Sequence, residues 1–321
     1  MADLHRIDVH HHVWPPIYFK VESERMAGTV IGWDRVSKWT ASMSIEAMDR
    51  NDVAVTVNSV STQQVHPDDP DGDAAFAREC NEFNARLTAD HKGRFGSFAL
   101  LPLPHVDRCL AEIEYAAGTL KADGFKLQTN YIDRWPGDPA FSPVFDELNR
   151  RKAAVFFHPH TPPVCMHLLP GVNEPLMEYP FDTTRAIASL LFSGTFARCP
   201  DIKYIFCHGG GAMPFLANRI GGLVKMRPEL NAWLPNGIEH ELKKLYFDVV
   251  SVTNRPAWAA LDALVDDDHL LFGTDIPYMT FETGLKELAE MEPAAGPRRA
   301  IERDNAIRIM PSLKAKVPAG R

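Results

Sequence analysis

The sequence has no apolar run long enough to cross a membrane, because no stretch approaches the roughly 18 apolar residues that a spanning helix needs. It also lacks an excess of basic residues, and its formal net charge is −8. This balance argues against nucleic acid and acidic membranes as partners, but a small anionic substrate responds only to local charge. The N-terminus, Met-Ala-Asp-Leu-His-Arg, has no signal-like apolar region, which predicts a cytoplasmic protein.

Redox and nucleotide-binding signatures are missing as well. The five cysteines form no Cys-x-x-Cys pair, and their odd number favours free thiols. No Gly-x-Gly-x-x-Gly follows the first strand-like run, which weakens a dinucleotide-binding fold. Gly209-Gly210-Gly211 lacks the Lys-Ser/Thr pair of a phosphate-binding loop. These glycines therefore indicate a sharp turn that positions His208, rather than a phosphate-binding site.

The chain does contain short apolar runs that alternate with amphipathic stretches, at an overall composition of 45% hydrophobic residues. Continuous apolar runs are typical of strands buried on both faces of a parallel sheet. The expected strands are 7–10, 53–60, 94–101, 124–128, 154–158, 202–208, 245–249 and 270–274. The expected helices are 44–51, 73–90, 107–119, 143–151, 183–198, 213–224, 256–265 and 282–291. Eight such repeats over about 270 residues predict a (β/α)₈ barrel, with a doubly wound open sheet as the alternative.

We expect residues 1–321 to form one barrel domain, with a docking helix near 300–310 and a loose tail over the final ten residues. Two connections, 14–43 and 159–182, are too long for simple turns. They follow the first and fifth strands, so in a barrel they lie on the face where active sites are built. We interpret them as substrate-covering loops, with plain linkers as the alternative.

A histidine tract closes the first predicted strand. Side chains alternate along a strand, so His10 and His12 share one face and can bind one metal ion, whereas His11 points the other way. A chance His-rich tract is the alternative. The pattern alone leaves both interpretations open.

Three further ionisable residues stand at the carboxyl ends of later strands. His158 and His208 end the fifth and sixth runs, and Asp275 follows the eighth. In a closed barrel these ends converge, and three imidazoles with one carboxylate suffice for a divalent ion with an open coordination position. A core histidine could explain any one of them singly, but their shared placement favours a metal centre.

Four segments resemble the motif set of the amidohydrolase superfamily. They are Asp8-Val-His10-His-His12, Phe157-His158-Pro159, Cys207-His208-Gly-Gly-Gly211 and Phe272-Gly-Thr-Asp275-Ile-Pro277. They are most similar to the branch related to aminocarboxymuconate-semialdehyde decarboxylase, which includes γ-resorcylate, 5-carboxyvanillate and 6-methylsalicylate decarboxylases. The resemblance runs from residue 7 to residue 311.

This resemblance implies a barrel with one divalent metal ion held by His10, His12, His158 and Asp275. It further implies that His208 is an acid/base residue, and that the protein forms a homodimer or a larger assembly of dimers. Some decarboxylases of the branch carry Glu-x-His on the first strand. The additional imidazole here favours Zn²⁺ over Mn²⁺, with Mn²⁺ as the alternative.

Lys126 lies on the fourth strand, where other amidohydrolases place a carboxylated lysine that bridges two metal ions. Because the branch resembled here is mononuclear, we expect instead a lysine that snorkels to solvent or faces the substrate.

The predicted function is metal-dependent decarboxylation of a small aromatic or muconate-type carboxylic acid. The carbon that bears the carboxylate must be protonated, and His208 and Asp275 are the candidate donors. Arg50, Arg185 and Arg219 could bind a substrate carboxylate, with surface ion pairs as the alternative role. One rival function is a hydrolase or hydratase that uses a metal-bound water, with His208 as its base. Another is a non-catalytic barrel.

Overall fold

A computed structural model describes residues 5–29, 36–61, 65–293 and 295–317. Its centre is an eight-stranded parallel sheet in which the strands follow one another in sequence order. The strands are β1 (Arg6–Val13), β2 (Val53–Val60), β3 (Phe95–Leu100), β4 (Gly124–Gln128), β5 (Ala154–His158), β6 (Lys203–Phe206), β7 (Tyr246–Asp248) and β8 (Leu270–Leu271). Backbone hydrogen bonds from Val9 N to Phe272 O (3.0 Å) and from Asp275 N to His10 O (2.7 Å) join β1 to the segment after β8. The predicted (β/α)₈ barrel is confirmed.

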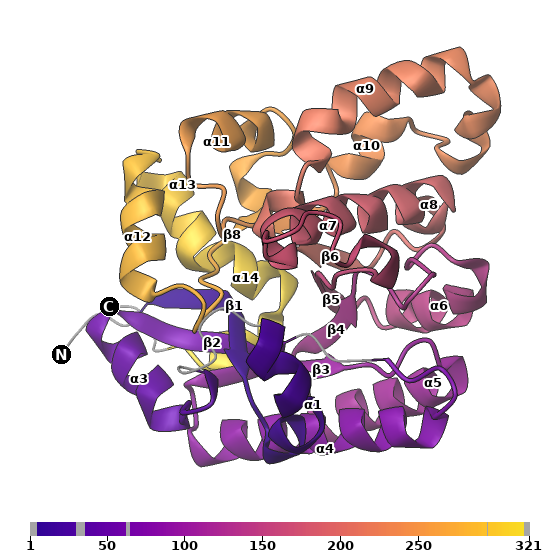
Figure 1. Cartoon of the computed structure of the whole chain (residues 1–321). Coiled ribbons are helices and arrows are strands. Elements are labelled where there is room, and N and C mark those ends of the chain that lie inside the picture. Colours follow the sequence, from indigo (N-terminus) through magenta and orange to yellow (C-terminus); the bar gives the residue numbers. More distant parts are fainter. Residues whose placement is uncertain (1–4, 30–35, 62–64, 294, 318–321) are drawn as a thin grey trace.

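Helices surround this barrel on its outside (Figure 1). They are α1 (Pro16–Thr29), α3 (Ala41–Arg50), α4 (Pro70–Asp90), α5 (Val106–Tyr115), α6 (Ser142–Arg150), α7 (Glu174–Phe192), α8 (Thr195–Arg198), α9 (Met213–Met226), α10 (Ile238–Leu242), α11 (Arg255–Asp262), α12 (Phe281–Glu290), α13 (Ala295–Arg299) and α14 (Asn305–Ile309). α6 illustrates the pattern, because it buries Val144, Phe145 and Leu148 on one face. No helix in the described ranges is long and apolar enough to span a membrane.

The barrel interior is filled with side chains, so it is a packed core rather than a channel. Inward-facing residues from the strands, such as Phe98, Phe156 and Ile205, form one apolar cluster. The C-terminal segment closes the lower end of this cluster with Met310 and Leu313. Only the opposite end, where the carboxyl ends of the strands lie, is left for a site.

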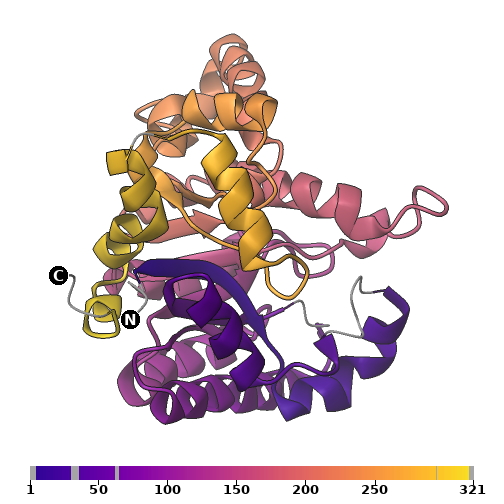
Figure 2. The same ribbon diagram turned by 90° about the vertical axis from the view of Figure 1, so that its left-hand side faces the viewer.

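The connections after β1 and β5 differ from the predicted loops. α1 lies within 14–43, and α3 begins at Ala41 with Thr40 as its cap instead of Ser44. Residues 30–35, which include Trp33, lie outside the described residues. α1 and the segment that precedes α7 project from the same end of the barrel (Figure 2).

The start of the predicted helix 183–198 was wrong. α7 begins at Glu174 and continues through Pro180. Asp182 does not cap a helix, because its carboxylate accepts hydrogen bonds from Thr129, Asn130 and Trp135. An Asp directly before a predicted helix is a common cap, but here tertiary hydrogen bonds engage its side chain instead.

The predicted loose tail was also wrong over residues 312–317. A 3₁₀ helix covers Pro311–Ala315, and Leu313 is completely buried. Lys316 Nζ pairs with Asp123 Oδ2 at 2.6 Å. Packing against the lower end of the barrel orders this segment, whereas residues 318–321 lie outside the described ranges.

Candidate metal centre

The histidine tract of β1 divides between the two faces of the sheet. The pairing of β1 with β2 shifts in register between positions 8 and 11, as at a β-bulge. His10 and His12 turn into the barrel, and their rings lie 5.0 Å apart. His11 points outward, where it stacks on Phe281 and hydrogen bonds with Ser44 Oγ at 2.9 Å. The predicted separation of His11 from its two neighbours is therefore observed.

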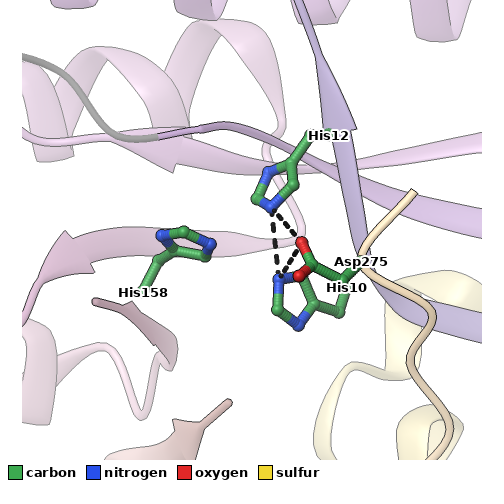
Figure 3. A group of neighbouring side chains, drawn as sticks. All are labelled: His10, His12, His158 and Asp275. Atoms are coloured by element: carbon green, nitrogen blue, oxygen red, sulfur yellow. Dashed lines mark hydrogen bonds and ion pairs between the residues drawn. The ribbon is translucent and has the colours of Figure 1, made fainter. Parts of the chain in front are cut away.

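Four side chains from three parts of the chain meet at the open end of the barrel (Figure 3). The Nε2 atoms of His10 and His12 are 3.2 Å apart. Asp275 Oδ1 lies 3.0 Å from His12 Nε2 and 3.2 Å from His10 Nε2. One donor atom of His158 completes a group within 4.8 Å of one another. Bonds of about 2.0–2.1 Å to a tetrahedral ion would separate their donor atoms by about 3.3 Å, so these residues fit one ion.

Hydrogen bonds on the far side of each imidazole orient this group. The bonds link His10 Nδ1 with Asp248 Oδ2 (2.8 Å), His12 Nδ1 with Ser59 Oγ (3.2 Å) and His158 Nδ1 with Pro159 O (3.0 Å). A carboxylate and a carbonyl can only accept, so Nδ1 of His10 and of His158 must carry a proton. In the neutral tautomer, each Nε2 then keeps a lone pair for a cation.

The pKa values describe the same arrangement. Burial acts to lower the pKa of His10, but the charges of Asp275 and Asp248 outweigh it and raise this pKa to about 10. Burial lowers the pKa of His12 to about 4 and that of His158 well below its usual value. Burial alone would raise the pKa of the Asp275 carboxyl, but the charge and hydrogen bond of His10 help hold it well below its usual range. Without a bound cation, the positive charge of protonated His10 balances the nearby carboxylates of Asp248 and Asp275.

His208 stands beside this group. It follows β6 with a φ of 53°, and its backbone N–H donates to Asp248 Oδ1 at 2.8 Å. Its Nε2 lies 3.4 Å from Asp275 Oδ2. The next residue, Gly209, has a φ of 59°, and a Cβ there would lie 2.7 Å from Val252. The glycine therefore permits the turn that brings His208 to the open end.

Asp248 is a residue that the sequence analysis missed. It is completely buried at the end of β7, and its two oxygens contact His10 Nδ1 and the backbone N–H of His208. A signal was present, since a lone carboxylate at the carboxyl end of an apolar strand is the same pattern that identified His158. Ser59, which contacts His12, carried no comparable signal.

Asp248→Asn is expected to weaken metal binding about 10- to 100-fold. The amide oxygen would accept from His208 N, so the amide NH₂ would face His10 Nδ1 and force the imidazole proton onto Nε2. Competition with a metal-binding dye measures the affinity for Zn²⁺ or Mn²⁺. Asp123→Asn, a buried carboxylate at the opposite end of the barrel, is the matched control. Unchanged affinity in Asp248→Asn would contradict the orienting role.

Lys126 is completely buried inside the barrel, so the predicted snorkelling to solvent was wrong. Its neighbour on β5 is Phe156, and its Nζ donates to Ser61 O at 3.3 Å. Burial lowers the pKa of this lysine to about 7.

Lys126→Met is expected to stabilise the protein at low pH. Folding lowers the pKa of Lys126 from 10.5 to about 7, so folding between pH 7 and pH 10.5 releases a proton. Below pH 7 the buried lysine is charged, and the charge lowers the free energy of unfolding by its full amount. We expect a gain on the order of 2–4 kcal/mol in the free energy of unfolding at pH 6, partly offset by the lost hydrogen bond to Ser61. The gain should shrink toward pH 10. Urea unfolding at both pH values measures it, and a loss of stability at pH 6 would contradict the prediction.

The three predicted substrate arginines lie apart from one another. Arg185 pairs with Glu178 Oε2 (3.5 Å) and Asp182 Oδ1 (3.8 Å). Arg50 ends α3 and lines a cavity of about 360 Å³ between α3 and α12, which none of the four converging side chains lines. Arg219 is exposed on α9. Within the described residues, no recorded contact joins any of these arginines to the converging group.

Comparison with known proteins gives one matching family and several related chains. The amidohydrolase family model matches residues 7–311. The chain is 33% identical over 327 residues to decarboxylase yanB of Aspergillus niger, covering 96% of this chain and 88% of that protein. It is 32% identical over 317 residues to a 6-methylsalicylic acid decarboxylase of Penicillium expansum, covering 96% and 97% of the two chains.

A solved structure shares the fold. It is a dihydroxybenzoic acid decarboxylase from Polaromonas sp. JS666 with bound manganese and the inhibitor 2-nitroresorcinol. The TM-score is 0.83 at 19% identity, and the match covers 96% of this chain and 97% of the other.

Proposed function

The chain belongs to the amidohydrolase family, and we propose that it is a metal-dependent decarboxylase of a small aromatic carboxylic acid. The observation that carries this proposal is the convergence of three imidazoles and Asp275 at the open end of the barrel, with His208 beside them. Relatives described as decarboxylases, at about one-third identity over nearly the whole chain, support the reaction type.

We assign His10, His12, His158 and Asp275 as ligands of one divalent ion. Three nitrogen donors and one oxygen favour Zn²⁺, and Mn²⁺ is the alternative that the Polaromonas relative holds. When bound, the ion would fix the substrate carboxylate and stabilise the negative charge that develops during reaction. The hydrogen bonds of the imidazoles with Asp248, Ser59 and the Pro159 carbonyl would keep the rings in place.

His208 is the residue we assign as proton donor. In decarboxylation the bond between the ring and the carboxylate breaks, CO₂ leaves, and the electron pair stays on the ring carbon that must take up a proton. The side chains of His208 and Asp275 are 12% and 16% exposed, so both reach the open end. The pKa of Asp275 is held well below its usual range, which keeps this carboxylate anionic and able to stabilise a protonated His208.

A decarboxylation screen tests the proposal. Protein loaded with Zn²⁺ or Mn²⁺ is incubated with 6-methylsalicylic acid and related 2-hydroxybenzoates, and both CO₂ and the decarboxylated ring product are quantified. We expect equimolar release of the two products, and no release by a His12→Ala control. Lactone opening or net water addition without CO₂ release would instead support the hydrolase or hydratase alternative and overturn decarboxylation.

A homodimer and a cytoplasmic location complete the proposal. Large apolar side chains are exposed on the segment before α7, on α7 and on α9, and patches of this kind often mark protein interfaces. They include Val164, Leu168, Leu169, Leu176, Phe181, Phe215 and Met226. Sedimentation at micromolar concentration should give twice the chain mass of 35.9 kDa, or an even multiple of it for a larger assembly of dimers, and a monomer would contradict the proposal. All five cysteines are free thiols, which supports a reducing compartment.

The substrate-binding roles of Arg50, Arg185 and Arg219 stay predictions. Arg185 already serves two carboxylates of α7, Glu178 and Asp182. Arg50 and Arg219 are exposed. The charge of Arg50 helps lower the pKa of Glu282. An exposed guanidinium can bind a carboxylate through two hydrogen bonds.

A further inference from the structure

A second group of metal-binding atoms lies close to the proposed four-ligand site. One donor atom each from His10, Cys207 and His208 lie within 4.8 Å of one another. His10 belongs to both groups, whereas Cys207 and His208 belong only to the second. The two groups are therefore neighbouring positions for an ion rather than one enlarged site.

Cys207 gives this second position its distinct chemistry. It follows β6, is completely buried, and belongs to the apolar cluster that fills the barrel interior. The second position therefore lies on the interior side of the site, whereas His208 remains 12% exposed above it. Among the described residues, Cys80, Cys109, Cys165 and Cys199 belong to no such group.

The donor types of the two groups select different ions. The four-ligand group offers three nitrogens and a carboxylate oxygen, which suit Mn²⁺ as well as Zn²⁺. The second group offers two nitrogens and one sulfur, and a soft thiolate favours thiophilic ions such as Cd²⁺. The bond lengths of zinc, about 2.3 Å to sulfur and about 2.0–2.1 Å to nitrogen, place the donor atoms of a tetrahedral ion about 3.3–3.6 Å apart. The three donor atoms lie within 4.8 Å of one another, so a shift of about 1.5 Å or less would bring them to an ion of this size.

We propose that His10, Cys207 and His208 form an alternative, inhibitory binding position for a thiophilic divalent cation. As the metal–sulfur bond forms, the thiol proton and the extra proton of the His10 imidazolium leave to solvent. Both imidazoles then bind as neutral ligands, and no atom changes oxidation state. An ion at this position takes His10 from the four-ligand group and engages His208. The inference rests on the proposed roles of these two histidines and predicts that thiophilic metal ions inhibit the enzyme.

Cadmium alone is the probe for this position. Metal-free protein is titrated with CdCl₂ while the ultraviolet charge-transfer band of a cadmium–thiolate bond is recorded. We expect the band to saturate at one Cd²⁺ per chain and to disappear in Cys207→Ser. It should persist in Cys109→Ser, a buried thiol packed elsewhere in the apolar core. His208→Ala should keep the band but lower the Cd²⁺ affinity at least about tenfold.

Separate measurements distinguish failure of this inference from failure of the metal centre. Mn²⁺ binding and circular dichroism establish that Cys207→Ser is folded, and Cys207→Ala serves if it is not. A wild-type protein that binds Mn²⁺ but shows no thiolate band with Cd²⁺ would overturn the second position and leave the proposed function intact. A band that persists without Cys207 would overturn it equally. A protein that binds neither ion would overturn the four-ligand centre itself.

Discussion

His208→Ala is expected to keep the metal ion while kcat falls about 10²- to 10⁴-fold, the usual range for loss of a general acid. His208 is not among the four side chains whose donor atoms converge, so the ion should stay. Its Nε2 faces Asp275 Oδ2 at 3.4 Å, and no other imidazole with solvent access lies at that oxygen among the described residues. The variant therefore removes a proton donor without removing a proposed ligand.

Metal analysis of the purified variant and steady-state kinetics at saturating metal measure these two effects separately. His240→Ala, an exposed histidine on α10, is the control for loss of an imidazole outside the site. Loss of metal together with activity would make His208 a ligand and overturn the division of roles. Unchanged kcat would transfer proton delivery to Asp275.

The proposed ligands were predictable from the sequence because their placement depends on local rules. His10 and His12 share a face because they are two residues apart within one strand. Both rings turn into the barrel although the pairing with β2 shifts in register between Asp8 and His11. His158 was identified because it ends the predicted strand 154–158, and these are also the bounds of β5. Such positions can be predicted from two rules: side chains alternate along a strand, and the carboxyl ends of parallel strands meet at one edge of the sheet.

Features that depend on distant partners were not predictable in this way. A carboxylate near the end of the predicted strand 245–249 was visible in the sequence, but the pairing of Asp248 with His10, 238 positions away, was not. α7 begins at Glu174 and runs through Pro180, while Asp182 accepts hydrogen bonds from residues far away in the sequence. Leu313 packs into the apolar cluster at the lower end of the barrel, although the sequence around it resembles a loose end. For α7 and for the C-terminal segment, long-range packing outweighed the local pattern from which the predictions were made.

Asp275→Asn is expected to have the largest effect of any single change, with turnover reduced more than in His208→Ala. Its Oδ1 lies within 3.2 Å of the Nε2 atoms of both His10 and His12, and its Oδ2 faces His208. The amide keeps the shape but removes the negative charge that draws a cation to the site and stabilises a protonated His208. Metal affinity and proton transfer should therefore fail together.

Titration of Asp275→Asn with Mn²⁺ or Zn²⁺, read by metal binding and by activity, separates the two contributions. We expect affinity to fall by at least about 100-fold, since a proposed ligand is lost rather than a supporting residue. If the carboxylate only binds metal, saturation should restore turnover. If it also holds His208 in its protonated form, the saturated variant should remain at least about 100-fold slower than wild type, within the usual range for acid catalysis. Full recovery at saturating metal would restrict Asp275 to ligation and leave His208 to act without it.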